Sequence, residues 1–398
     1  MTPPERLVPL EVAACGREQA AWAVGLRFCL PARLLEISGL ARHLDCQGRL
    51  RIPSDMPPIP PGEAARLRAL RAFTPRGPLS SRLPISYRRV PDCLRSGYAS
   101  LLGRLQRRRA HRWAEFPRWP LDLSSDLLAD LSGSAIAPQV SAPPASAPTP
   151  VILSHDLDSA AGLKNLVASF LAIEESVGAR STNFVVPCAW PLDFALLDEL
   201  RDRGHEIGIH GYDHSNRTPF VSPAERKHRL DAAIPLAARY DARGYRAPSL
   251  CRTRPLLADL AGRYAYDGSI PTSGGLFPAA NNGCASARPF SLAGLAELPL
   301  SLPRDGSLRF LGYAPREIER LWIHLAETIA RSGGVVVLLT HCEERFSGNP
   351  AMLAAYRNFV QYIAESDRFQ WSTPQQVLHD RLPAAPGAPA ASVTALAN

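Results

Sequence analysis

Apolar and polar positions alternate in a regular way in the second half of the chain. Short apolar runs predict strands, and apolar residues at helical spacing predict helices between them. The predicted strands are residues 151–153, 181–186, 206–209, 333–339 and 369–372. The predicted helices are residues 162–177, 193–203, 222–239, 350–366 and a last one that opens at Thr373.

Alternating strands and helices predict an α/β fold with a parallel sheet. Over roughly 230 residues, a closed or nearly closed α/β barrel is the natural solution for such a pattern. We therefore expect a distorted (β/α) barrel. In barrels of this kind the active-site residues lie at the carboxyl ends of the strands.

The first third of the chain has weaker patterns. Residues 63–73 and 95–113 have helical spacing, and residues 84–90 look extended. Residues 134–149 are uncharged and rich in Ala, Pro and Ser, which is typical of a linker, and the similar tail at 382–398 is expected to be disordered. This divides the chain into an N-terminal extension or companion domain of unknown role (1–133), the linker, the barrel (150–381) and the tail.

The net charge of +8 comes almost entirely from arginine, since only Lys164 and Lys227 are lysines. Arginine bias with many Ala and Pro residues can reflect a GC-rich genome, so it is weak evidence for nucleic acid. The densest basic stretch, residues 104–112, lies beside Leu101, Leu102 and Leu105. This favours a helix with one solvated cationic face over a phosphate-binding patch. We expect no nucleic-acid partner.

Cysteine usage and the start of the chain bear on the compartment. Eight cysteines are scattered without a CxxC pair, which argues against a thiolate zinc site. We expect them to be reduced and mostly buried. Residues 1–10 lack the cationic and apolar regions of a signal peptide, and no segment approaches the ~18 apolar residues of a membrane helix. These features predict a cytoplasmic protein without stable membrane insertion.

Two carboxylates follow the strand predicted at 151–153. Asp156 and Asp158 are two positions apart, and such side chains point to the same side of an extended chain. A single Asp here would be better explained as a turn residue or as the N-cap of the next helix. Two carboxylates on one side favour a shared functional site.

Two imidazoles follow the strand predicted at 206–209. His210 and His214 can reach one metal ion if the loop or a first helical turn brings them together. Alone, such a pair is as often structural as functional. With a carboxylate pair at another strand end, it predicts a His₂Asp site for Zn²⁺ or a similar divalent ion, with positions left for water and substrate.

Arg246 and His341 complete the candidate site. Arg246 stands before Ala247 and Pro248, where its guanidinium can pair with a carboxylate, although taken alone it is better explained as a surface residue before a turn. His341 follows the apolar run at 335–339. A histidine at the end of a buried strand is more often a proton donor than a packing residue.

Four motifs in this order resemble a known family. They are the aspartate motif at 156–158, Gly-His-Glu-Ile-Gly-Ile-His-Gly-Tyr-Asp-His at 204–214, Arg-Ala-Pro at 246–248 and Leu-Thr-His at 339–341. Together they resemble the polysaccharide deacetylases, the NodB-homology enzymes of carbohydrate esterase family 4. The resemblance covers residues 150–380 and implies a barrel of the polysaccharide deacetylase type.

The resemblance implies a metal site and three further roles. Asp158, His210 and His214 would bind a divalent metal, with Zn²⁺ the leading candidate and Co²⁺, Ni²⁺ or Mn²⁺ as alternatives. The catalytic residues would be Asp156 as general base, Arg246 as the residue that holds Asp156, and His341 as general acid. Segments 266–270 and 297–299 also resemble parts of this family and are expected to line the substrate groove.

Two departures from the family pattern concern the substrate. Leu157 separates aspartates that are usually adjacent, and Gly211 stands where Ser or Thr is usual. The leading hypothesis is a hydrolase that removes an N-acetyl or other acyl group from an amino-sugar-containing glycan, glycan precursor or glycosylated small molecule. The alternatives are a hydrolase of another linear or cyclic amide bond, and an inactive metal-bearing barrel that binds glycans.

Overall fold

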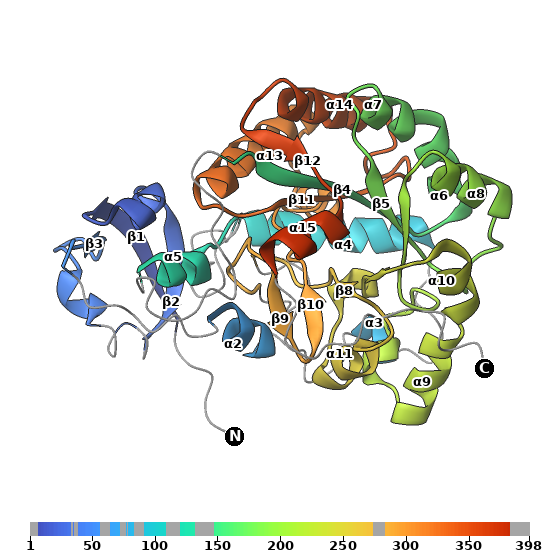
Figure 1. The fold of residues 1–398 in the computed structure, drawn as a ribbon, viewed down its shortest axis with the longest axis horizontal. Coiled ribbons are helices and arrows are strands. Elements are labelled where there is room, and N and C mark those ends of the chain that lie inside the picture. Colours follow the sequence, from blue (N-terminus) through green and yellow to red (C-terminus); the bar gives the residue numbers. More distant parts are fainter. Residues whose placement is uncertain are drawn as a thin grey trace.

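An α/β barrel with a smaller three-stranded unit beside it makes up the molecule (Figure 1). The computed structural model describes residues 7–32, 35, 39–55, 64–71, 77, 79–82, 91–108, 120–131, 147–273 and 283–382. All six candidate site residues lie in the described ranges.

The barrel sheet has nine strands in the described part of the chain. They are β4 (Thr149–Leu157), β5 (Ser181–Val185), β6 (Glu206–Ile209), β7 (Gly244–Tyr245), β8 (Tyr266–Asp267), β9 (Phe290–Leu292), β10 (Leu295–Glu297), β11 (Val336–His341) and β12 (Phe369–Trp371). Their order is β11-β4-β5-β6-β7-β8-β10-β9, with β12 paired to the start of β4. All pairs are parallel except β9 with β10.

The sheet curls toward closure after β10. Leu302 donates a backbone hydrogen bond to the carbonyl of Val337 in β11 (3.1 Å), and Val337 donates to Ser301 Oγ (2.7 Å). The segment after β10 therefore reaches the strand at the opposite end of the sheet order. The structure is a distorted (β/α) barrel, as the sequence predicts.

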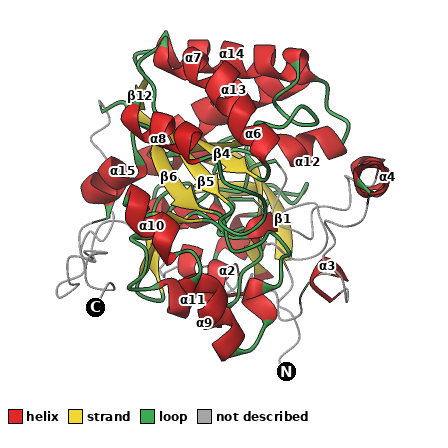
Figure 2. Ribbon diagram, turned by 90° about the vertical axis from the view of Figure 1, so that its right-hand side faces the viewer, coloured by secondary structure: helices red, strands yellow, loops and turns green. Residues whose placement is uncertain are grey.

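Helices surround the strands, which lie at the centre of the barrel (Figure 2). They are α6 (Ala160–Asn165), a π-helical segment (Leu166–Phe170), α7 (Leu171–Glu175), α8 (Phe194–Asp202), α9 (Pro223–Asp231), α10 (Ile234–Tyr240), α11 (Arg254–Leu260), α12 (Asp305–Phe310), α13 (Pro315–Arg331), α14 (Pro350–Ala364) and α15 (Pro374–Arg381). The apolar faces of these helices other than α15 and the outer faces of the strands form the main core. A second cluster, which includes Ile152, Phe184 and Val337, fills the barrel interior.

The five strands predicted from the sequence are confirmed, but the helix predicted over 222–239 is broken into α9 and α10. Pro235 explains the break, because it has no amide hydrogen to donate to the preceding turn. Helix α13 was not predicted, although its apolar residues have helical spacing. Ile318, Trp322 and Ile329 are among those that it buries.

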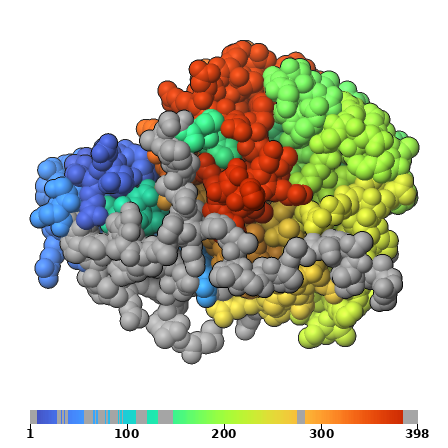
Figure 3. All heavy atoms as spheres, viewed as in Figure 1, coloured from blue at the N-terminus to red at the C-terminus, as the bar shows by residue number. Residues whose placement is uncertain are grey.

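The N-terminal unit contains strands that the sequence pattern did not predict. β1 (Leu7–Cys15) lies between β2 (Arg27–Pro31) and β3 (Leu50–Ile52), and α5 (Ser124–Leu131) packs on them. In the space-filling view this unit lies at one end of the molecule (Figure 3). Asp126 and Asp130 of α5 connect it to the barrel, since Asp126 accepts from Ala287 N (2.8 Å) and Asp130 pairs with Arg288 (2.7 Å).

Two short helices, α2 (Ala64–Arg71) and α3 (Leu79–Arg82), and the longer α4 (Asp92–Arg108) follow the small sheet. The helices predicted over 63–73 and 95–113 correspond to α2 and α4. The predicted extended segment 84–90, residues 134–146 of the linker and residues 383–398 of the tail lie outside the described residues.

One expectation about the core is wrong. Of the seven cysteines with described side chains, only Cys251, Cys284 and Cys342 are buried, so the cysteines are not mostly buried. Arg104, Arg107 and Arg108 of the basic stretch are exposed on α4, as the sequence predicts. Leu101 and Leu105 are 57% and 39% exposed, so part of the apolar side of this helix also faces outward.

Candidate active site

Four strands bring the candidate residues to one end of the barrel. β4 contains Asp156, and β11 ends at His341, which is the register partner of Asp156. His210 directly follows β6, and Arg246 directly follows β7. Because these strands run parallel in one sheet, their carboxyl ends meet at the same edge of the barrel.

Asp158, His210 and His214 form a compact group. One ligand atom from each of the three lies within 4.8 Å of the others. Oδ1 of Asp158 is 3.1 Å from Nε2 of His214 and 3.5 Å from Nε2 of His210. One carboxylate and two imidazoles converging in this way have the composition of a catalytic zinc site that keeps an open position.

The protonation of His210 fits a metal ligand. Its Nδ1 donates a hydrogen bond to the carbonyl of Arg246 (3.0 Å), which leaves Nε2 with a free lone pair. Nε2 is buried and has no hydrogen-bond partner among the described residues. Burial lowers the pKa of His210 to about 4, more than nearby Asp156 raises it, so the ring is neutral at physiological pH. A neutral imidazole with a buried, unpaired nitrogen is what metal binding requires.

The loop that carries the two histidines depends on an unusual backbone. Gly211 has φ +67°, and a Cβ there would lie 2.4 Å from Cδ of Pro248. His214 has φ +57°. The Gly211 backbone therefore leaves no room for the Ser or Thr that the family pattern has at this position.

Arg229 of α9 supports the same loop. Its Nη1 lies 3.3 Å from Ser215 Oγ and 3.5 Å from Asp213 Oδ1, and its guanidinium stacks 5.1 Å from the Tyr212 ring centroid. Arg229 is 9% exposed. The sequence motif did not identify Arg229, because it belongs to a helix that follows the loop and has no marked spacing of its own.

Arg246 holds Asp156 through a hydrogen bond and is itself fixed by two more. Its Nη1 donates to Asp156 Oδ1 at 2.9 Å, its Nη2 to Ser154 Oγ at 3.1 Å, and its Nε to the carbonyl of Gly268 at 3.1 Å. The guanidinium also lies 4.0 Å from the ring centroid of Phe184. Arg246 is therefore a buried, fully engaged residue and not the surface residue that it would be on its position alone.

The two aspartates remain ionised despite burial. Burial raises the pKa of Asp156, but interactions with His210 and Arg246 outweigh it and leave the pKa below its ordinary value. Burial likewise raises the pKa of Asp158, and the attraction of His214 brings it well below the ordinary value. Both carboxylates are therefore charged at neutral pH, one as a ligand candidate and the other as a base candidate.

His341 has a carboxylate partner that sequence reasoning missed. Its Nδ1 donates to Oδ1 of Asp305, the first residue of α12, at 2.7 Å. Asp305 Oδ2 also accepts from the backbone N of His341 (2.8 Å) and from Ser347 Oγ (2.7 Å). Burial lowers the pKa of His341, but the negative charge of Asp305 raises it by more than burial lowers it, and the net result is a pKa of about 9. His341 is therefore protonated at neutral pH.

Glu343 is a second acidic residue at the site that was not predicted. It is 9% exposed and its Oε1 accepts a hydrogen bond from Ser159 Oγ at 2.8 Å. Ser159 follows Asp158 and caps the helix that begins at Ala160. Burial, together with the negative charge of Asp158, raises the pKa of Glu343 to about 7. Glu343 thus links the loop after β11 to the loop after β4.

The segments expected to line a substrate groove are buried instead. Asp267 and Glu297 are 0% and 1% exposed, and Glu297 Oε1 accepts from Ile270 N at 3.0 Å. Their contribution to the site is indirect, since the carbonyl of Gly268 accepts the Nε hydrogen bond of Arg246. This part of the chain supports the site residues and does not form an open groove.

No protein-family model matches the chain, and no curated protein matches it in sequence. Among solved structures, the chain is similar to a protein described as a polysaccharide deacetylase from Mycobacterium smegmatis, at 23% identity and TM-score 0.47, over 61% of this chain and 93% of that one. A polysaccharide deacetylase described from Pseudomonas aeruginosa PAO1 has 17% identity and TM-score 0.46, over 66% and 97%. The PuuE allantoinase has 16% identity and TM-score 0.47, also over 66% and 97%.

Proposed function

We propose that the chain is a metal-dependent hydrolase that removes an acyl group, in the first place N-acetyl, from an amino-sugar-containing glycan or glycan precursor. The observation that carries the proposal is the placement of two differently charged groups beside one ligand cluster. Asp156 is held as an anion by Arg246, and His341 is held as a cation by Asp305. Opposite protonation states in one site provide a base and an acid for the same reaction.

Asp158, His210 and His214 would hold the metal, with Zn²⁺ the leading candidate. A divalent metal bound there would polarise the substrate carbonyl and lower the pKa of a bound water. Asp156 would accept the proton of the attacking water, because its carboxylate is ionised and lies beside the three candidate ligands. Its Oδ2 is 3.5 Å from Nε2 of His210. Arg246 would keep that carboxylate oriented through its 2.9 Å hydrogen bond.

His341 would donate the proton that the leaving nitrogen needs. Water adds to the acyl carbon, the C–N bond then breaks, and the amine departs with the proton from His341. A pKa of about 9 keeps this histidine protonated at neutral pH. The role is a general acid whose second ring nitrogen is occupied by Asp305, which fixes the ring orientation.

The sugar substrate rests on the motif resemblance, while the hydrolytic chemistry rests on the site. The test is an acetate-release screen of the purified protein on N-acetylated amino sugars and oligosaccharides, with a cyclic amide and a linear acyl amide as comparison substrates. We expect acetate release from an N-acetylated sugar, loss of that activity after chelation, and its return when Zn²⁺ is added back.

Other outcomes would point to the alternatives. Turnover of the comparison amides without acetate release from sugars would mean that the chain hydrolyses amide bonds but that its substrate is not an amino sugar. Glycan binding with no turnover of any substrate would indicate an inactive binding barrel and contradict the proposal. The cytoplasmic location predicted from the sequence remains a proposal, in which the substrate would be a soluble glycan precursor, a nucleotide- or lipid-linked intermediate, or a glycosylated metabolite.

A further inference from the structure

Helix α4 carries an apolar stripe on its outward side. Four of the six large hydrophobic side chains that are exposed in the described part of the chain lie on this one helix. They are Leu94 (62% exposed), Tyr98 (63%), Leu101 (57%) and Leu105 (39%). Spacings of four, three and four residues place them on a single face of the helix.

The opposite side of α4 fixes the helix to the barrel. Gly103 packs so closely that a Cβ there would lie 2.0 Å from the carbonyl oxygen of Phe310. Arg107 donates to the carbonyl of Gly312 at 2.8 Å and lies 4.5 Å from the ring centroid of Tyr313. On a helix with about 100° per residue, Gly103 is opposite the centre of the stripe. The helix therefore cannot turn to bury its stripe without losing these contacts.

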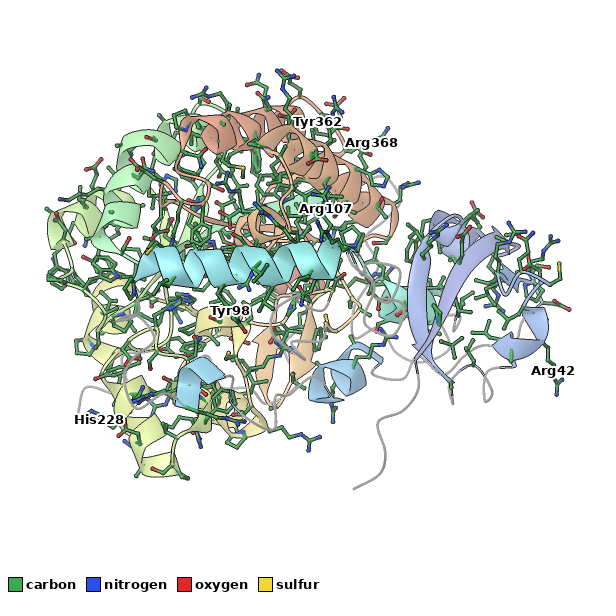
Figure 4. The ribbon with its side chains drawn as sticks, turned by 180° about the vertical axis from the view of Figure 1, so that it is seen from behind. Arg42, Tyr98, Arg107, His228, Tyr362 and Arg368 are labelled. Atoms are coloured by element: carbon green, nitrogen blue, oxygen red, sulfur yellow. The ribbon has the colours of Figure 1, made fainter. Side chains whose placement is uncertain are left out.

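The charges beside the stripe have one sign. Arg104 and Arg108 are exposed and fall on one flank of the stripe at about 100° per residue. After its first residue, Asp92, the helix contains no acidic residue as far as Arg108. Seen from behind, the helix crosses the face of the barrel, with Tyr98 and Arg107 on it (Figure 4). An apolar face bordered by arginines is the composition of a helix that lies in the plane of an anionic bilayer surface.

A chain of aromatic contacts places α4 near the candidate active site. The ring centroid of Phe346 is 4.8 Å from that of His341 and 5.9 Å from that of Phe310. Phe310 in turn contacts Gly103 of α4. The inner side of the helix is therefore linked to the end of β11 through Phe310 and Phe346.

We propose that α4 is a membrane-surface binding element that lays Leu94, Tyr98, Leu101 and Leu105 into the headgroup region of an anionic lipid bilayer. No helix in the described part of the chain is long and apolar enough to cross a membrane. The stripe is one side chain deep and about 16 Å long at 1.5 Å per residue, and it lies on a convex helix and not in a groove. Such a surface suits a fluid interface better than a shaped protein partner. The proposal does not depend on the proposed hydrolase activity.

The test is co-sedimentation of the full chain with vesicles of phosphatidylcholine, with and without phosphatidylglycerol. We expect binding to the anionic vesicles that weakens as salt is added. The double variant Leu94→Gln/Leu101→Gln should weaken it about tenfold or more, since two apolar side chains no longer enter the interface. Arg104→Gln/Arg108→Gln should also weaken it about tenfold and reduce its salt dependence.

Phe194→Gln is the matched control, because Phe194 is 45% exposed on α8, away from the stripe, and should bind vesicles like the unchanged chain. Thermal unfolding checks that all variants fold, which the exposure of these positions favours. Absence of binding to both vesicle types would overturn the proposal, as would equal loss in the Phe194 variant or equal binding to neutral vesicles. A dimer that the leucine variants dissociate, without vesicle binding, would make the stripe an interface between two copies and likewise overturn it.

Discussion

Nδ1 of His341 donates a 2.7 Å hydrogen bond to Asp305, which comes from a helix that begins 36 positions before the histidine. This pair raises the pKa of His341 to about 9 and gives the site a cationic histidine at neutral pH. The partner of the proposed acid is thus supplied by α12, outside all of the sequence motifs.

Asp305→Asn should move the alkaline limb of the pH–kcat profile downward. Without the carboxylate, the pKa of His341 should fall from about 9 toward the ordinary value of about 6.5. Because the proposed acid acts only when it is protonated, the loss of activity on raising the pH should begin at a lower pH in the variant than in the unchanged chain. The measurement is kcat against pH for both proteins, and an unchanged alkaline limb would separate Asp305 from the acid.

The same pair has a consequence for stability. The pKa of His341 is higher in the folded chain than in the unfolded chain, so protonated His341 stabilises the fold. This stabilisation is complete below about pH 6.5 and is lost as the pH rises through about 9. The urea unfolding free energy of the unchanged chain should therefore fall across this window more than that of Asp305→Asn.

Asp156→Asn should keep the metal and lose most turnover. Asparagine preserves the shape of the side chain but cannot accept the proton of the attacking water, and general-base catalysis is worth roughly 10²–10⁴-fold. The measurements are kcat and metal content of the same preparation. A variant with near-normal kcat would remove Asp156 from the role of base.

Gly211→Ser should destabilise the metal loop. At φ +67° a side chain is strained, and its Cβ would lie 2.4 Å from Pro248. Gly262→Ser is the control, because Gly262 has φ +81° with nothing within 4 Å of the added Cβ. We expect roughly 1 kcal/mol of lost stability for the control and about 2–3 for Gly211→Ser, with metal affinity reduced only in the latter. Equal effects would mean that the contact with Pro248 has no role.

Arg229→Ala should weaken metal binding by roughly 10- to 100-fold, because its contacts with Asp213 and Ser215 hold the loop on either side of His214. Arg226→Ala is the matched control. Arg226 is also buried on α9, but it pairs with Asp259 at 2.6 Å, away from the loop. Metal titration of both variants distinguishes a positioning role from general damage to the helix, which would affect the two equally.

Five strands of the barrel, and the meeting of the candidate residues at one end of it, were predictable because they followed from local patterns. The apolar runs before Asp156, His210 and His341 marked strand ends, and a parallel barrel brings strand ends together. Asp305 and Glu343 carry no such pattern. Their roles come from contacts with His341 and Ser159 that only the folded chain creates.

The N-terminal strands were missed for a related reason. In β1, only Leu10 and Val12 are both described and fully buried, and Pro9 interrupts the apolar pattern. Strand pairing with β2 and β3 supplies the rest of the stabilisation. Helix α13 is different, because its apolar residues have clear helical spacing and the helix was predictable from the sequence.

The decisive measurement for a metal held by Asp158, His210 and His214 is the metal content of the purified chain and of His210→Ala, determined side by side by elemental analysis. His210 supplies a buried nitrogen that has no hydrogen-bond partner among the described residues and lies in the three-residue group with Asp158 and His214. We expect one divalent metal per unchanged chain and a loss of most of it in the folded variant. Equal metal content in both proteins, or none in the unchanged chain after Zn²⁺ is supplied, would contradict it.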